Sequence, residues 1–199
     1  MQLIVTIARR AALAAGVIGL VAGSLAIGGE VAQGEEFMGS ALAEVAGWLS
    51  FASPALLVVA LVGVAVRWGA RLTRGGATAL LVLAFATAAT VGAAATLALV
   101  VPALVDVAPE MAVSPPASVP ATFIISGLVM AASGIALAIS LRPHLTKGQF
   151  RLLVIGSVVA MLPLPSRSFL LALALTPVLG ATGERQADAD AANAVPAAA

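Results

Sequence analysis

The chain has no cysteine, no tyrosine and a single histidine, His144. Without cysteine it can form no disulfide, thiolate nucleophile or thiolate metal site. One histidine alone cannot supply the several ligands that a metal site needs. Charged residues make up only 10% of the 199 residues, against about 25% in a typical globular protein. These shortages exclude several kinds of catalytic centre and argue against a soluble domain.

Apolar residues are abundant instead, at 61% of the chain, and they are gathered in five long stretches. A helix of about 20 residues crosses a hydrocarbon core of about 30 Å, and a helix satisfies its own backbone hydrogen bonds there. We therefore predict an all-α, polytopic membrane bundle of about five transmembrane helices within one domain, 1–180. The predicted helices cover residues 11–29, 40–66, 77–101, 120–141 and 152–180. The Ala-rich tail, 181–199, lacks large apolar residues and is predicted to be disordered.

The signs of the loop charges predict the orientation. The ten Lys and Arg residues, apart from Arg167 and Arg185, all fall in the loops on one side, and no acidic residue falls there. Because basic loops remain in the cytoplasm, we expect a cytoplasmic N-terminus. The net charge of +1 gives no reason to expect nucleic acid as a partner. Few lysines beside much Ala, Gly, Val and Arg indicate a bacterial protein, and hence the plasma (inner) membrane.

The first apolar stretch has an alternative interpretation, because a basic flank before an apolar run also describes a signal peptide. The span 11–29 is longer than the usual apolar region of about 7 to 15 residues, and no clear cleavage site follows it. We therefore favour its retention as a first helix.

The fifth stretch is irregular. At about 1.5 Å per residue, a straight helix over 152–180 exceeds the hydrocarbon core, and Pro163 and Pro165 each remove a backbone donor. Two interpretations remain: a helix broken near these prolines that crosses once, or a re-entrant hairpin of two half-helices. We favour the single crossing, which places the C-terminus outside.

Arg167 is the candidate functional residue, because a guanidinium inside an apolar stretch usually faces a partner or a water-filled cavity. Glu44, near the outer end of the second helix, is expected at a similar depth. The sharpest hypothesis is an intramembrane ion pair or pathway formed by Glu44 and Arg167. The alternatives are that Arg167 extends to the outer headgroups or that it contacts a substrate.

Small residues mark candidate helix-packing faces, since membrane helices associate by close backbone approach. Such faces are predicted at two positions in the first helix and two in the third, and along a serine seam in the fourth. The residues concerned are Gly19, Gly23, Ala88, Gly92, Ser126, Ser133 and Ser140. The seam is also compatible with a polar pathway, but serines often bond to the preceding turn, so packing is preferred.

The basic loop 142–151 also has two interpretations. Arg142, His144, Lys147 and Arg151 are suited to anionic lipid headgroups, but ordinary topology signalling explains the same residues and is preferred.

No catalytic, nucleotide or metal motif is present, so we predict no enzyme activity, no cofactor and no metal site. The favoured hypothesis is a non-catalytic accessory or scaffold subunit of a membrane complex, in contact with the bilayer and with other membrane subunits or itself. The alternative is a transporter or channel component for a small neutral or anionic solute.

Overall fold

Four apolar runs form helices that are long enough to cross a membrane, within the part of the chain that the computed structural model describes. That part covers residues 1–100, 107, 117–162 and 166–180, without the side chains of 35, 36, 38, 97 and 119. The four helices are Gln2–Gln33 (α1), Ala41–Trp68 (α2), Arg74–Ala95 (α3) and Ser118–Leu141 (α6). A multi-pass helical membrane protein is therefore confirmed.

Shorter elements connect and complete these helices. The connecting 3-10 turns are Gly34–Gly39 (η1), Gly69–Arg71 (η2) and Arg142–His144 (η4), and α3 continues into a π-helical turn, Thr96–Val100 (η3). The fifth apolar stretch forms two helices, Lys147–Val159 (α7) and Phe169–Gly180 (α8). The predicted break near Pro163 and Pro165 is thus present, although residues 163–165 themselves lie outside the described part.

Hydroxyl side chains begin three of the helices. Ser40 Oγ accepts from Ala43 N at the start of α2, and Thr73 Oγ1 accepts from Gly76 N at the start of α3. Thr146 and Gln149 form a reciprocal capping box that begins α7. Each cap satisfies backbone N–H groups that a helix leaves unpaired in its first turn.

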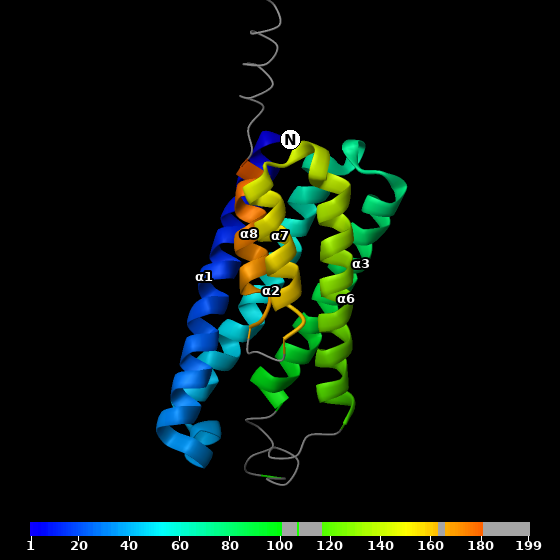
Figure 1. Cartoon of the computed structure of the whole chain (residues 1–199). Coiled ribbons are helices and arrows are strands. Elements are labelled where there is room, and N and C mark those ends of the chain that lie inside the picture. The colour runs from blue at the N-terminus through cyan, green and yellow to red at the C-terminus, as the bar shows by residue number, and fades with distance from the viewer. Residues whose placement is uncertain (101–106, 108–116, 163–165, 181–199) are drawn as a thin grey trace, which may run out of the picture.

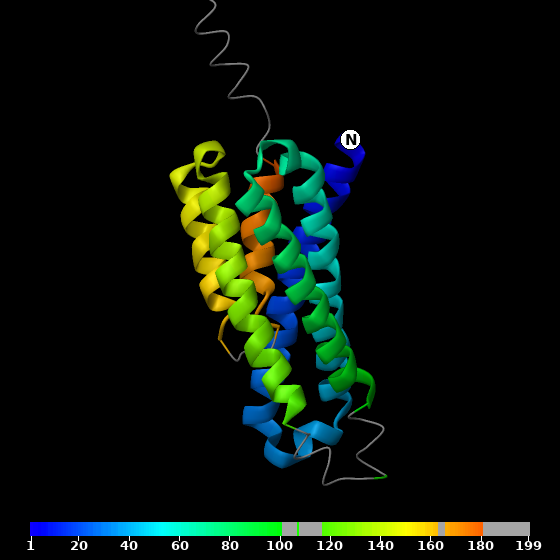
Figure 2. The same cartoon turned by 90° about the vertical axis from the view of Figure 1, so that its right-hand side faces the viewer.

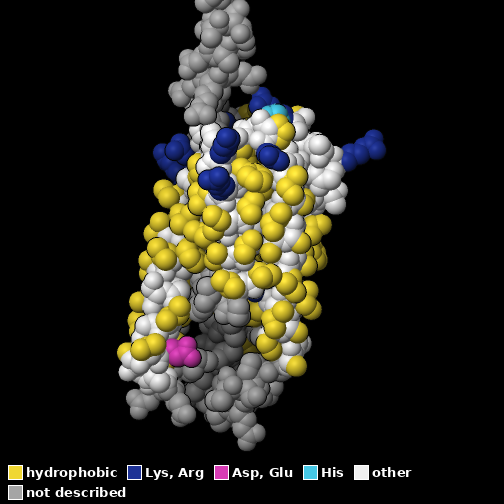
Figure 3. Space-filling view, viewed as in Figure 1, with side chains coloured by type: hydrophobic (Ala, Val, Ile, Leu, Met, Phe, Trp, Pro, Cys, Tyr) yellow, Lys and Arg dark blue, Asp and Glu magenta, His cyan; other side chains and the backbone are white. Residues whose placement is uncertain are grey.

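The helices pack in a ring, each beside the next: α1 on α2, α2 on α3, α3 on α6, α6 on α7, α7 on α8 and α8 on α1 (Figures 1 and 2). Helix α8 also touches α2. Half of its residues are buried, including Leu171, Leu175 and Leu179. Exposed apolar side chains cover the outside of the bundle, as expected for a surface that faces lipid (Figure 3).

Lys and Arg side chains gather at one end of the bundle, and acidic side chains lie toward the other (Figure 3). We call the first the basic end; α1 begins there, and the α2–α3 and α6–α7 connections lie there. Its basic residues are Arg9, Arg10, Arg67, Arg71, Arg74, Arg142, Lys147 and Arg151. Helix α1 begins earlier than expected, so Arg9 and Arg10 lie within it.

The favoured single crossing of residues 152–180 is wrong, because α7 and α8 form an antiparallel hairpin (Figure 1). Gln149 Nε2, in the first turn of α7, donates to the Pro177 carbonyl near the end of α8, across 3.2 Å. A Cβ placed on Gly180 would lie 2.9 Å from the Arg9 guanidinium carbon. Helix α8 therefore ends at the basic end, where α1 begins; the tail 181–199 lies outside the described residues.

The hairpin depends on close backbone contact at one glycine. A Cβ on Gly156 of α7 would lie 2.9 Å from both the Leu170 carbonyl oxygen and Leu171 Cα. Since real Cβ atoms almost never come so close to backbone, no other residue fits here without moving a helix. Two half-length helices can thus pack as tightly as transmembrane helices that meet at small residues.

Candidate functional site

Arg167 lies deep inside the bundle, in the turn that leads into α8. The 12 residues of α8 rise about 18 Å toward the basic end, so the guanidinium is far from that surface. The preceding residue, Ser166, has a φ of 53°, a left-handed conformation that non-glycine residues seldom adopt. Its carbonyl accepts from Phe169 N, and its hydroxyl donates to Ser50 Oγ of α2 across 3.0 Å. These contacts hold the turn and aim Arg167 at α6.

The Arg167 side chain is only 3% exposed. Its Nη2 donates to Ser126 Oγ of α6 across 2.6 Å, and its guanidinium carbon lies 5.5 Å from the centre of the Phe123 ring. Nε has no hydrogen-bond partner among the residues that the structure describes. The charge is therefore met by one hydroxyl and one aromatic face, both from α6.

Gly127 provides the space for this contact. A Cβ at that position would lie 2.6 Å from Arg167 Nη1 and 3.0 Å from the Ala160 carbonyl oxygen. The glycine beside Ser126 thus lets the guanidinium come close to α6.

The predicted ion pair between Glu44 and Arg167 is not formed. Arg167 is buried and bonds to Ser126, whereas Glu44 is exposed in the first turn of α2. Six residues of helix, or about 9 Å of rise, separate Glu44 from Ser50, where α2 meets the turn before Arg167. Glu44 is therefore displaced along α2 from the level at which the turn before Arg167 contacts this helix.

The interpretation that Arg167 extends to the outer headgroups is wrong as well. A side chain with 3% exposure does not reach a headgroup layer. A long side chain on a straight, lipid-facing helix could extend to the headgroups. The turn at Ser166 instead directs the Arg167 side chain into the bundle.

The serine seam of α6 is divided among three partners. Ser126 binds Arg167, Ser133 donates to the Val129 carbonyl of its own helix, and Ser140 hydrogen-bonds Thr73. Ser126 and Ser133 are buried, and Ser140 is partly exposed. Each hydroxyl has its own neighbour, as expected for packing.

The small residues of α1 and α3 differ in their surroundings. Gly19 is buried, and a Cβ there would meet Ser53 Oγ at 2.6 Å and Phe169 Cβ at 2.8 Å; Gly23 is partly buried. Ala88 and Gly92 are exposed, and no atom lies within 4 Å of a Cβ on Gly92. The face of α3 that packs inward is instead the one with Leu83, Thr87 and Thr90 among its residues.

Several residues that shape the site were not singled out from the sequence. Ser53 Oγ donates to the Ala15 carbonyl across 2.8 Å and joins α2 to α1. Ser50 holds the turn before α8, Gly127 makes room for the guanidinium, and Gly156 allows the close packing of the hairpin. The sequence signal was weak, because serine and glycine are common throughout this chain.

Chemically, the site offers one buried cation and hydroxyl groups. Such a set can bind or orient an anion, or hold a hairpin in place, but it contains no acid–base pair. No group of three or more His, Asp or Glu side chains that could hold a metal ion occurs among the described residues.

Comparison with known proteins gives no relative: no protein-family model, no curated protein and no solved structure matches this chain.

Proposed function

We propose that the protein is a non-catalytic subunit of a larger membrane complex, and that a transmembrane helix of a different subunit packs against the outer face of α3. One observation carries the proposal: the small-residue face at Ala88 and Gly92 is uncovered in the folded chain. Small residues allow the close backbone approach that drives helix association in lipid.

The flanks of this face favour a helix as its occupant. Phe85, about one turn before Ala88, is 79% exposed, and Leu81, about two turns before it, is 72% exposed. Large apolar side chains form a ridge, and the neighbouring Ala and Gly form a groove. A second helix can pack against such a surface. The buried hydroxyl groups support the same role, because they take part in packing. Each donates a hydrogen bond to a backbone carbonyl; the residues are Ser53, Thr87, Thr90 and Ser157.

The proposed location is the plasma membrane of a bacterium, with the basic end in the cytoplasm. The proposal rests on the concentration of Lys and Arg at one end of the bundle (Figure 3) and on the retention of basic loops in the cytoplasm.

The test is gentle purification from the native membrane, with mass spectrometry of the intact assembly. A partner membrane protein in fixed ratio is expected, and Gly92→Leu should release it. Gly28→Leu is the matched control, because Gly28 is an exposed glycine of α1 that also has no atom within 4 Å of its Cβ position. A partner that stays bound to the Gly92→Leu protein, or a homo-oligomer without any other subunit, would contradict the proposal.

A second function, in the transport of a small anionic or neutral solute, is favoured by the hairpin. Transporters often place their binding sites where discontinuous helices meet near the middle of the membrane, and here that point carries Arg167. This function requires water to reach the guanidinium. Labelling of Ser126→Cys by a membrane-impermeant thiol reagent would favour transport, and its absence in intact membranes favours the subunit role.

A further inference from the structure

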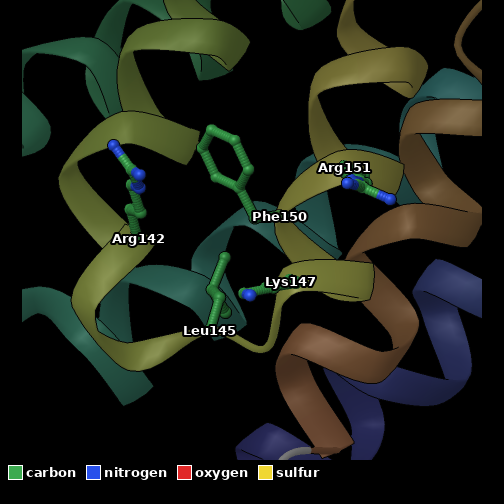
Figure 4. Close-up of a pocket in the computed structure, with 5 residues that line it drawn as sticks. All are labelled: Arg142, Leu145, Lys147, Phe150 and Arg151. Atoms are coloured by element: carbon green, nitrogen blue, oxygen red, sulfur yellow. The ribbon is translucent and has the colours of Figure 1, made fainter.

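We propose that a cavity at the basic end binds the phosphate of an anionic phospholipid headgroup. The cavity has a volume of about 330 Å³ and is lined by Arg142, Leu145, Lys147, Phe150 and Arg151 (Figure 4). Ligand sites begin at about this volume, so the space suits a headgroup. This inference does not depend on the subunit role.

The lining pairs cations with apolar side chains. Arg142 and Leu145 come from the connection between α6 and α7, and Lys147, Phe150 and Arg151 come from α7 (Figure 4). The Arg142 guanidinium carbon lies 5.7 Å from the centre of the Phe150 ring, a contact that orients this long side chain. Basic groups for a phosphate, next to apolar groups for the glycerol and upper chains, match an amphipathic lipid.

The positive charge of the cavity has no nearby acidic group among the described residues. The described carboxylates, Glu30 and Glu44, lie in the last turn of α1 and the first turn of α2, at the opposite end of the bundle. Helix α7 has no acidic residue in its first turn, so its positive N-terminal dipole adds to the field of Lys147 and Arg151. An anion from outside the chain would stabilise all of these groups.

The position of the cavity indicates where the anion comes from. The apolar span that contains α6 ends at His144, so the cavity lies where the hydrocarbon core gives way to headgroups. Ile139, in the last turn before Arg142, and Ile155, one turn after Arg151, are exposed apolar side chains. Lipid chains can therefore lie along the outside of α6 and α7 while the headgroup enters the cavity.

The experiment titrates short-chain phosphatidylglycerol into the intact, detergent-purified protein and counts bound lipids by native mass spectrometry. The pocket variant is Arg142→Gln with Arg151→Gln. The control is Arg10→Gln with Arg74→Gln, which removes the same charge from exposed positions at the same end but outside the cavity. A basic residue near an anionic surface changes binding about fivefold, so we expect an approximately thirtyfold loss in the pocket variant and an unchanged first binding event in the control.

Two further arms distinguish the source of the phosphate. Phosphatidylcholine should bind much more weakly, because its headgroup carries no net charge. Inorganic phosphate should not compete with phosphatidylglycerol at equal concentration, because it lacks the glycerol and chains. Equal losses in both double variants would show general surface attraction, and full competition by inorganic phosphate would show a soluble anion as the ligand; either result overturns the proposal.

Discussion

Arg167 Nη2 donates to Ser126 Oγ across 2.6 Å and so joins the turn before α8 to the middle of α6. Among the described residues the guanidinium makes no other hydrogen bond: the Phe123 ring lies beside it, and Nε finds no partner in this part of the chain. A single hydroxyl thus anchors the one charged side chain that is buried inside the bundle, among the residues that the structure describes.

The first prediction concerns this bond. Ser126→Ala should lower the free energy of unfolding by about 1–2 kcal/mol, because a buried charged donor loses its acceptor. In an Arg167→Leu background the same change should cost almost nothing, which gives a coupling energy of about 1–2 kcal/mol. Reversible unfolding in mixed micelles measures all four proteins. Ser133→Ala is the control, since Ser133 bonds only to carbonyls of its own helix; a coupling of Ser133 as large as that of Ser126 would show that the Arg167 contact has no special weight.

The second prediction separates Glu44 from Arg167. Because Glu44 is exposed and Arg167 binds Ser126, Glu44→Gln and Arg167→Gln should have additive effects on unfolding, within about 0.5 kcal/mol. The same micelle assay measures both single variants and the double variant. A clearly smaller loss in the double variant than the sum would restore the ion pair that the sequence suggested.

The third prediction tests the hairpin contact. Gly156→Ala should destabilise the protein by about 2 kcal/mol or more, since the added carbon meets the backbone of α8 and overpacking in a dense core is unfavourable. Gly92→Ala is matched in chemistry but adds its carbon in open space. It should be neutral or stabilise α3 by up to about 1 kcal/mol through helix propensity. Thermal unfolding of the purified variants measures both changes in stability. Equal effects at both glycines would be incompatible with the packed hairpin.

The fourth prediction concerns topology. Because the chain has no cysteine, single cysteines at Gly148, Gly180 and Gly28 report their own positions. A membrane-impermeant maleimide should label Gly148→Cys and Gly180→Cys from the same side of the membrane, and Gly28→Cys from the opposite side. Sealed vesicles of both orientations provide the comparison. Labelling of Gly180→Cys together with Gly28→Cys would instead indicate the single crossing.

By itself, the sequence determined the membrane class, the helical bundle and the break after α7. Long apolar runs with few charges allow only helices in lipid, and the two closely spaced prolines, Pro163 and Pro165, each remove a backbone donor and so favour a break there. These are local properties, so they could be read without knowing which helices touch.

Only the tertiary structure decided the direction of α8, the partner of Arg167 and the inward face of α3. Pro163 and Pro165 predict a break in the fifth stretch, but the return of the chain depends on a close approach between Gly156 and Leu170–Leu171. In the same way, Glu44 and Ser126 are both plausible partners by depth, and only the rotation and order of the helices bring Ser126 to Arg167. The face of α3 that carries Ala88 and Gly92 has the spacing of a packing face. The helices beside α3 in the ring nevertheless cover a different face of it, the one that carries Leu83. In a chain so rich in alanine and glycine, spacing alone does not distinguish these faces, because nearly every helix face is small and apolar.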